Sequence, residues 1–81
     1  MPRRSPKSTK NPVARAIGQV LRRHREKAHL TQERFAELVD LSKNYVGNLE
    51  RGEYEISISK LQQIAQALKL KASDIVREAG Y

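Results

Sequence analysis

The polar residues best suited to bind a partner lie between positions 42 and 52. Four of them fall on one side of a helical pattern and carry polar or small side chains: Lys43, Asn44, Gly47 and Asn48. Val46 and Leu49 take the opposite side, where apolar residues attach a helix to a core. Asparagine pairs with adenine, and lysine with guanine, in the major groove of DNA. The pattern favours base contacts by Lys43 and Asn44, whereas Asn48 suits a base or a phosphate equally.

Catalytic and metal-binding arrangements are not favoured by the sequence. His24 and His29 lack further ligands at metal-site spacing, and the chain has no cysteine. No Ser/His/Asp set or pair of carboxylates forms a catalytic arrangement, and a chain of 81 residues is small for a closed pocket. We therefore expect a single domain that is not an enzyme and holds no cofactor, metal or disulfide.

Positive charge is concentrated in the N-terminal third. Residues 1–29 carry a formal charge of +8, residues 30–81 carry −1, and the whole chain carries +7. Such asymmetry indicates a polyanionic partner, either nucleic acid or an anionic membrane surface, although a solvated charged face is the simpler alternative. A membrane role is disfavoured because the apolar face of the first helix is needed for the core. No apolar run is long enough to span a bilayer.

Residues 1–12 contain three prolines, no acid and no large apolar residue after Met1. This composition predicts a flexible basic arm, since it buries too little apolar surface to order itself. We expect four side chains of the arm to attract phosphates without sequence preference: Arg3, Arg4, Lys7 and Lys10. Insertion of Arg3 and Arg4 into a minor groove is the alternative. A transit peptide is disfavoured because the prolines oppose an amphipathic helix.

Residues 13–81 carry the periodicity of five helices. Asn11 and Pro12 suit the cap and first turn of the first helix. Thr31, Ser42, Ser57 and Ser73 suit the caps of the other four, the last of which spans Asp74 to Ala79. Asp40 tolerates the left-handed turn between the second and third helices, and Gly52 suits the end of the third. The sequence therefore predicts an all-α domain.

The expected core follows from the same periodicity. The apolar positions of the first, second and fourth helices are Val13, Ile17, Val20, Leu21, His24 and Ala28; Phe35, Ala36, Leu38 and Val39; and Ile58, Leu61, Ile64, Ala65 and Leu68. Leu41 packs inward from the turn. Ala36 is small where two helices must approach closely.

The segment LTQERFAELVDLSKNYVGNLERGE resembles the helix-turn-helix of the lambda-repressor-like, Cro-type (XRE) family. The likeness extends over roughly 13–79 and includes the Leu61-x-x-Ile64-Ala65-x-x-Leu68 pattern. It implies a five-helix lambda-repressor-like fold and a bacterial or phage source. Small members of similar size include phage Cro proteins and restriction–modification controller proteins. The chain departs from the family glycine pattern at Asp40 and Lys69, and Lys71 replaces the usual cap of the fifth helix.

The resemblance assigns roles to individual side chains. It implies base contacts by Lys43, Asn44 and Asn48, and phosphate contacts by Gln32 and Ser42. It matches Arg25 and Glu50 to a pair that ties the first helix to the recognition helix. We also expect three further residues to contact the DNA backbone: Thr31, Tyr45 and Arg51.

Together these features predict a cytoplasmic, nucleoid-associated regulator of transcription that binds double-stranded DNA. It would act as a homodimer on a pseudo-palindromic operator, with recognition helices about 34 Å apart or a multiple of that, and would block or recruit RNA polymerase. The candidate dimer surface is Leu70, Ile75, Val76 and Tyr81. The alternative is an antitoxin-type protein whose main partner is another protein.

Overall fold

The computed structural model describes residues 11–81, which form five α-helices and no strand. The expected contacts of Arg3, Arg4, Lys7 and Lys10 lie outside these described residues. The helices are α1 (Pro12–Lys27), α2 (Gln32–Val39), α3 (Lys43–Glu50), α4 (Ile58–Ala67) and α5 (Ala72–Glu78). The predicted all-α, five-helix fold is therefore confirmed. None of the described helices is both long enough and apolar enough to cross a membrane.

Four of the five predicted caps hold the helix starts. The side-chain oxygens of Asn11, Thr31, Ser42 and Ser57 each accept a hydrogen bond from a backbone N–H in the first turn of α1, α2, α3 and α4, at 2.9 to 3.1 Å. Such caps satisfy amide groups that have no partner within the helix. Asn11 and Pro12 begin α1, so they belong to the helical part of the chain and not to the arm.

The start of α5 differs from its prediction. Its cap is Lys71, and Ser73 lies inside the helix. The carboxylate of Asp74 reaches back and accepts the backbone N–H of Lys71 at 2.9 Å. A lysine offers no acceptor for the first turn. The helix instead begins where an acid at its third position can take the amide of the cap.

Three helices end at residues with left-handed backbone conformation. His29, Asp40 and Lys69 have φ of 60°, 61° and 62° and follow α1, α2 and α4. Asp40 was predicted to take this conformation, whereas His29 was not. Lys69 keeps the turn that the family makes with glycine, although a side chain there costs about 1–2 kcal/mol. The turns after α2 and α4 therefore form at Asp40 and Lys69 without the glycines that are usual in the family.

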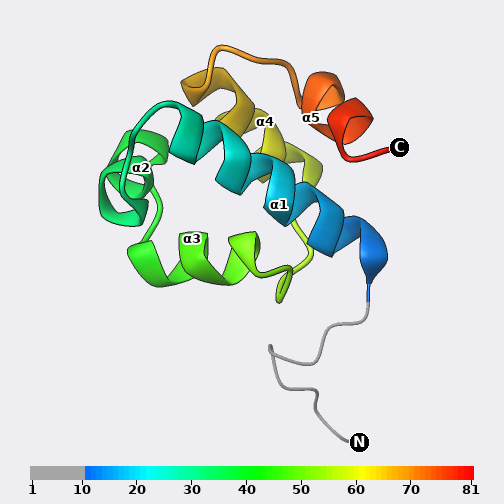
Figure 1. The fold of residues 1–81 in the computed structure, drawn as a ribbon, viewed down its shortest axis with the longest axis horizontal. Helices are drawn as coiled ribbons and strands as arrows, with labels where there is room; N and C mark the ends of the chain where they lie inside the picture. The colour runs from blue at the N-terminus through cyan, green and yellow to red at the C-terminus, as the bar shows by residue number, and fades with distance from the viewer. Residues whose placement is uncertain (1–10) are drawn as a thin grey trace, which may run out of the picture.

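The core lies between the five helices. In Figure 1 α1 crosses the molecule between α3 and α5; α2 packs on α3 and α4, and α4 packs on α5. The buried apolar side chains are Ala14, Ile17, Val20, Leu21, Phe35, Ala36, Val39, Val46, Leu49, Leu61, Ile64, Ala65 and Ile75. At the ends of α1 and α5, His24 Nε2 lies 2.9 Å from Glu78 Oε1 and joins the two helices.

Three residues that were expected in the core are exposed instead: Leu38, Ile58 and Ala28. Leu38 is 55% exposed and Ile58 is 72% exposed. The eight residues of α2 bury Phe35, Ala36 and Val39, which leaves Leu38 at the flank. Ile58 opens α4 a turn before its first buried residue, and Ala28 is exposed at the end of α1.

Ile75 was expected on a dimer surface, and this prediction is wrong. The residue is completely buried in the core formed by the other helices. Because α5 packs on both α1 and α4, its apolar side faces the core and not the solvent. Leu70 and Val76 are half-buried, and Tyr81 is exposed, so these three keep surface for a partner.

A glycine sets how closely α1 and α3 approach. A Cβ atom at Gly18 would lie 2.2 Å from the carbonyl oxygen of Leu49 and 2.9 Å from that of Glu50. Real carbon atoms do not approach oxygens this closely, so no other residue fits without moving a helix. Gly18 therefore allows α1 to lie directly against the C-terminal half of α3.

Candidate nucleic-acid interface

The turn between α2 and α3 is short and held by backbone hydrogen bonds. The amide of Leu41 donates to the carbonyl of Ala36 at 2.9 Å, and the amide of Asp40 donates to that of Glu37 at 3.2 Å. Asp40 supplies the left-handed residue that reverses the chain. This places two short helices in the arrangement in which the second can enter a DNA groove while the first crosses the backbone.

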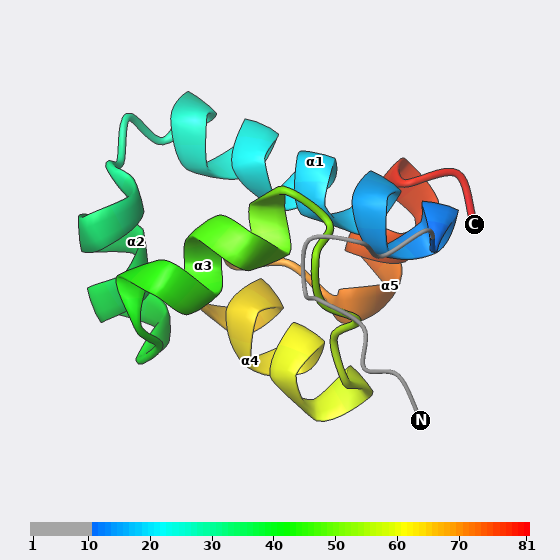
Figure 2. The same ribbon diagram turned by 90° about the horizontal axis from the view of Figure 1, so that it is seen from below.

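The recognition helix α3 has an inner side and an outer side. Val46 and Leu49 are buried against the core, as predicted, whereas Lys43 and Asn44 are exposed. Figure 1 places α3 at the lower edge of the fold, and in Figure 2 no other helix lies in front of it. The side of α3 that carries Lys43 and Asn44 is therefore open to a partner.

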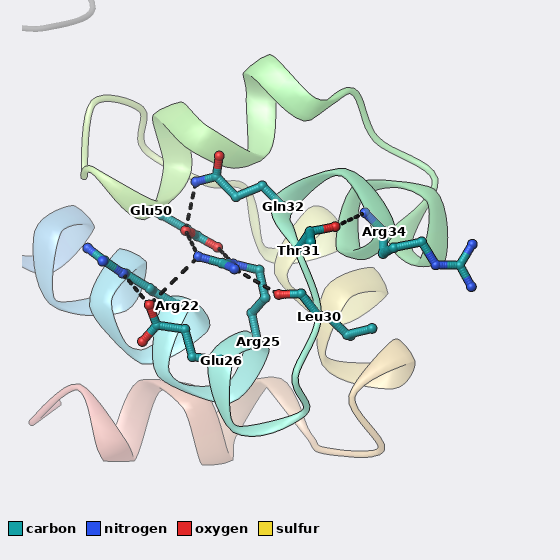
Figure 3. Close-up of polar contacts among 8 residues, drawn as sticks. All are labelled: Arg22, Arg25, Glu26, Leu30, Thr31, Gln32, Arg34 and Glu50. Carbon is teal, nitrogen blue, oxygen red and sulfur yellow. Dashed lines mark hydrogen bonds and ion pairs between the residues drawn. The ribbon is translucent and has the colours of Figure 1, made fainter.

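A buried ion pair holds α3 to α1. Arg25 Nε donates to Glu50 Oε2 at 2.7 Å and Arg25 Nη2 donates to Glu50 Oε1 at 3.1 Å (Figure 3). The two side chains are only 12% and 3% exposed. Hydrogen bonding to Glu50 raises the pKa of Arg25 above its usual value, against the opposing effect of burial. This ion pair, the strut, is the contact that the resemblance implied for the two residues.

The strut also includes the start of α2. Gln32 Nε2 donates to Glu50 Oε1 at 3.0 Å, and Arg25 Nη1 donates to the carbonyl of Leu30 at 2.8 Å (Figure 3). Three helices therefore meet at one carboxylate, which fixes α2 and α3 relative to α1. The amide of Gln32 is engaged with Glu50 in this structure, and its contact with a phosphate stays a prediction.

The two predicted hydroxyl contacts lie at helix starts. Thr31 and Ser42 use their oxygens to cap α2 and α3, and both residues are exposed. A hydroxyl that accepts a hydrogen bond still carries its own O–H donor. The N-terminus of a helix also favours a negative group through its free amides and its dipole. Both positions suit a phosphate oxygen.

The end of α3 carries a cluster that the sequence did not predict. The rings of Tyr45 and Tyr54 are stacked, with centroids 5.6 Å apart. Asn48 Nδ2 donates to the hydroxyl of Tyr54 at 3.2 Å, and Asn48 Oδ1 accepts from Arg51 Nη2. Tyr54 belongs to no helical pattern. The sequence feature that could have pointed to it is the presence of an aromatic residue in the polar loop after Gly52. Asn48 is therefore less open than Lys43 and Asn44.

Comparison with known proteins identifies the fold and the family. Residues 21–75 match the Helix-turn-helix family (HTH_3). The immunity repressor protein of Bacillus phage phi105 is 39% identical over 62 residues, which cover 76% of this chain and 43% of that protein. Control protein C.BamHI of Bacillus amyloliquefaciens is 30% identical over 67 residues, covering 82% of this chain and 83% of that one.

Among solved structures, the restriction-modification controller protein C.AhdI of Aeromonas hydrophila superposes with a TM-score of 0.72 at 34% identity. The match covers 76% of this chain and 94% of that one. The chain thus spans less than half of the phage repressor and most of the two control proteins. The match over residues 21–75 and the similarity to control protein C.BamHI show that the chain belongs to the helix-turn-helix family (HTH_3).

Proposed function

We propose that the protein is a sequence-specific, double-stranded DNA-binding regulator of transcription that acts as a homodimer on a pseudo-palindromic operator. The observation that carries this proposal is that no other helix lies in front of α3 in Figure 2 and that Lys43 and Asn44 of this helix are exposed. Both side chains match groups that bind base edges in the major groove. The relatives are named as a repressor and a control protein, so we propose no catalytic activity for this chain.

Contacts with the DNA backbone would set the position of α3. Gln32, Thr31 and Ser42 stand at the starts of α2 and α3, where a phosphate is favoured. Tyr45 would lie along the sugar-phosphate chain, and the four basic residues of the arm would add attraction that depends on salt. These contacts give affinity and orientation, while Lys43 and Asn44 give sequence preference.

The dimer would use the surface at the end of the chain. Tyr81 is exposed, and Leu70 and Val76 keep part of their apolar surface. A two-fold symmetric dimer places two copies of α3 in successive major-groove segments, about 34 Å apart or a multiple of that. Bound in this way, the protein would regulate genes in the cytoplasm by blocking or recruiting RNA polymerase. The antitoxin-type alternative finds no support among the relatives, and we do not propose it.

The test is selection of binding sites from a random double-stranded DNA library with the purified full chain. We expect an enriched palindrome whose half-site spacing matches one helical turn or a multiple. Asn44→Ala should weaken binding to that site by about 1–3 kcal/mol and relax the preference at one base pair of each half-site. Gln66→Ala removes an equivalent exposed amide from α4 and is the control. Enrichment of no sequence by the wild-type protein would contradict the proposal.

A further inference from the structure

A second arginine–glutamate pair stands at the outer end of α3. Arg51 Nε donates to Glu53 Oε2 at 3.0 Å, and Arg51 Nη2 lies 3.4 Å from Glu53 Oε1. Arg51 Nη2 also donates to Asn48 Oδ1. The arginine side chain is 58% exposed, whereas that of Glu53 is only 12% exposed. The guanidinium is therefore held along one edge from the protein side and remains open on the other.

Counting donors shows which part of Arg51 remains available. A guanidinium has five N–H groups. Glu53 and Asn48 engage Nε and Nη2, and within residues 11–81 no oxygen accepts from Nη1. Nη1 lies 3.4 Å from the position that a Cβ atom would take on Gly47. The available donors thus lie over α3 itself, next to the turn that carries Lys43 and Asn44.

Asn48 is held at both ends of its amide. Its Nδ2 donates to the hydroxyl of Tyr54, and its Oδ1 accepts from Arg51. Tyr54 is in turn fixed by its stacking on Tyr45. A side chain that meets two internal partners acts as a link between them. Asn48 therefore orients Arg51, and in this conformation it offers less to a base than its place on α3 suggested.

We propose that Arg51 is a base-contacting residue, and that it binds the major-groove edge of a guanine through Nη1. Asn48, Glu53 and Tyr54 are positioning residues that hold the guanidinium over α3. This assignment rests on the proposed function, and it replaces the expected roles of Arg51 at a phosphate and Asn48 at a base. Arginine to the O6 and N7 atoms of guanine is the commonest specific contact between proteins and DNA.

Two physical reasons favour a base over a phosphate. Glu53 offsets the charge of Arg51, which weakens its attraction to a phosphate but leaves its remaining N–H donors in place. The network also fixes a long side chain before binding, so less of its freedom is lost on forming a directional contact. A phosphate contact carries no sequence information, so a fixed guanidinium there would add no base preference.

The experiment compares binding-site selections by the full-length wild-type protein, Arg51→Lys and Tyr54→Phe. We expect the wild type to select guanine at one position of each half-site. Arg51→Lys should lower that preference about 10- to 100-fold and leave the other positions unchanged. Tyr54→Phe keeps the stacked ring and removes one hydroxyl, so it should lower the same preference by about 3-fold. When Arg51→Lys is already present, Tyr54→Phe should not lower the guanine preference further. If Tyr54 were merely structural, its effect would not depend on Arg51.

Arg77→Lys is the matched control, because it makes the same change in an exposed arginine–acid pair on α5. It should leave the base preference unchanged. Weaker binding of Arg51→Lys to all sequences alike, with a shallower salt dependence, would mean a phosphate contact and would overturn the inference. So would a Tyr54→Phe profile equal to that of the wild type. Failure of the proposed function would appear separately, as no enriched site for the wild-type protein.

Discussion

The two arginine–glutamate pairs of α3 use the same chemistry in different surroundings. Arg25 and Glu50 lie between three helices, at 12% and 3% exposure, while Arg51 and Glu53 lie at the outer rim, at 58% and 12%. In both, a guanidinium lies against a carboxylate at hydrogen-bonding distance. The inner pair satisfies its groups within the protein, whereas the outer pair leaves Arg51 Nη1 without an acceptor among residues 11–81. Burial, and not residue type, separates the structural pair from the one that we propose binds DNA.

The largest effect should come from breaking the inner pair. Glu50→Gln would leave Arg25 charged and mostly buried, and we expect the free energy of unfolding to fall by about 3–5 kcal/mol. Urea denaturation measures it, with Glu37→Gln as the exposed control. The pKa of Arg25 is higher in the folded protein than in the unfolded chain. The stabilisation from its charge is therefore complete at any pH below the unfolded-state pKa. It is lost only when the pH rises through the folded-state pKa. The difference between wild type and Glu50→Gln should thus stay constant from about pH 6 to about pH 10. A decrease in the free energy of unfolding of less than about 1 kcal/mol would mean that the strut does not stabilise the fold more than a surface ion pair does.

A smaller effect should come from disturbing the close contact between α1 and α3 at Gly18. Gly18→Ala places a methyl group against two carbonyl oxygens of that helix, and we expect a loss of about 1–3 kcal/mol. Gly47→Ala in α3 is the matched change; Gly47 is buried as well, beneath the side chains of Arg51 and Gln32, and not on the open side that its place in the pattern suggested. Its added carbon would meet Arg51 and Gln32 only at 3.4 Å or more. It should be neutral or raise stability by up to about 1 kcal/mol, because alanine favours a helix. Equal thermal midpoints for the two variants would contradict this difference in the space around the two glycines.

The smallest effect on stability should come from breaking the outer pair. Glu53→Gln leaves the exposed guanidinium of Arg51 free to be hydrated, so its thermal midpoint should change no more than that of Glu37→Gln. Added salt should reduce even this difference, since it screens exposed charges more than buried ones. If the outer pair serves DNA binding and not folding, Glu53→Gln should clearly change the base preference and hardly change the stability. A large loss of stability would mean that Glu53 has a structural role like that of Glu50.

The five helices and most of their ends could be predicted from the sequence, the start of α5 being the exception. Caps such as Thr31 and Ser42, and the left-handed Asp40, act through neighbouring amides, so their effect is local and visible in the pattern. The same holds for Val46 and Leu49, which follow from helical periodicity. The strut was available only through the resemblance, because nothing local links Arg25 to a residue 25 positions away.

The tertiary structure alone decided which side of each short helix is covered and which polar groups meet. Ile75 and Leu38 have similar apolar character, yet one is buried and the other exposed, because burial depends on what packs against a helix. Gly18 gained its role only when α3 came within contact distance, and Tyr54 gained its role only through Asn48. Periodicity places a side chain on its helix, but its neighbours across the fold determine whether it supports the protein or faces the DNA.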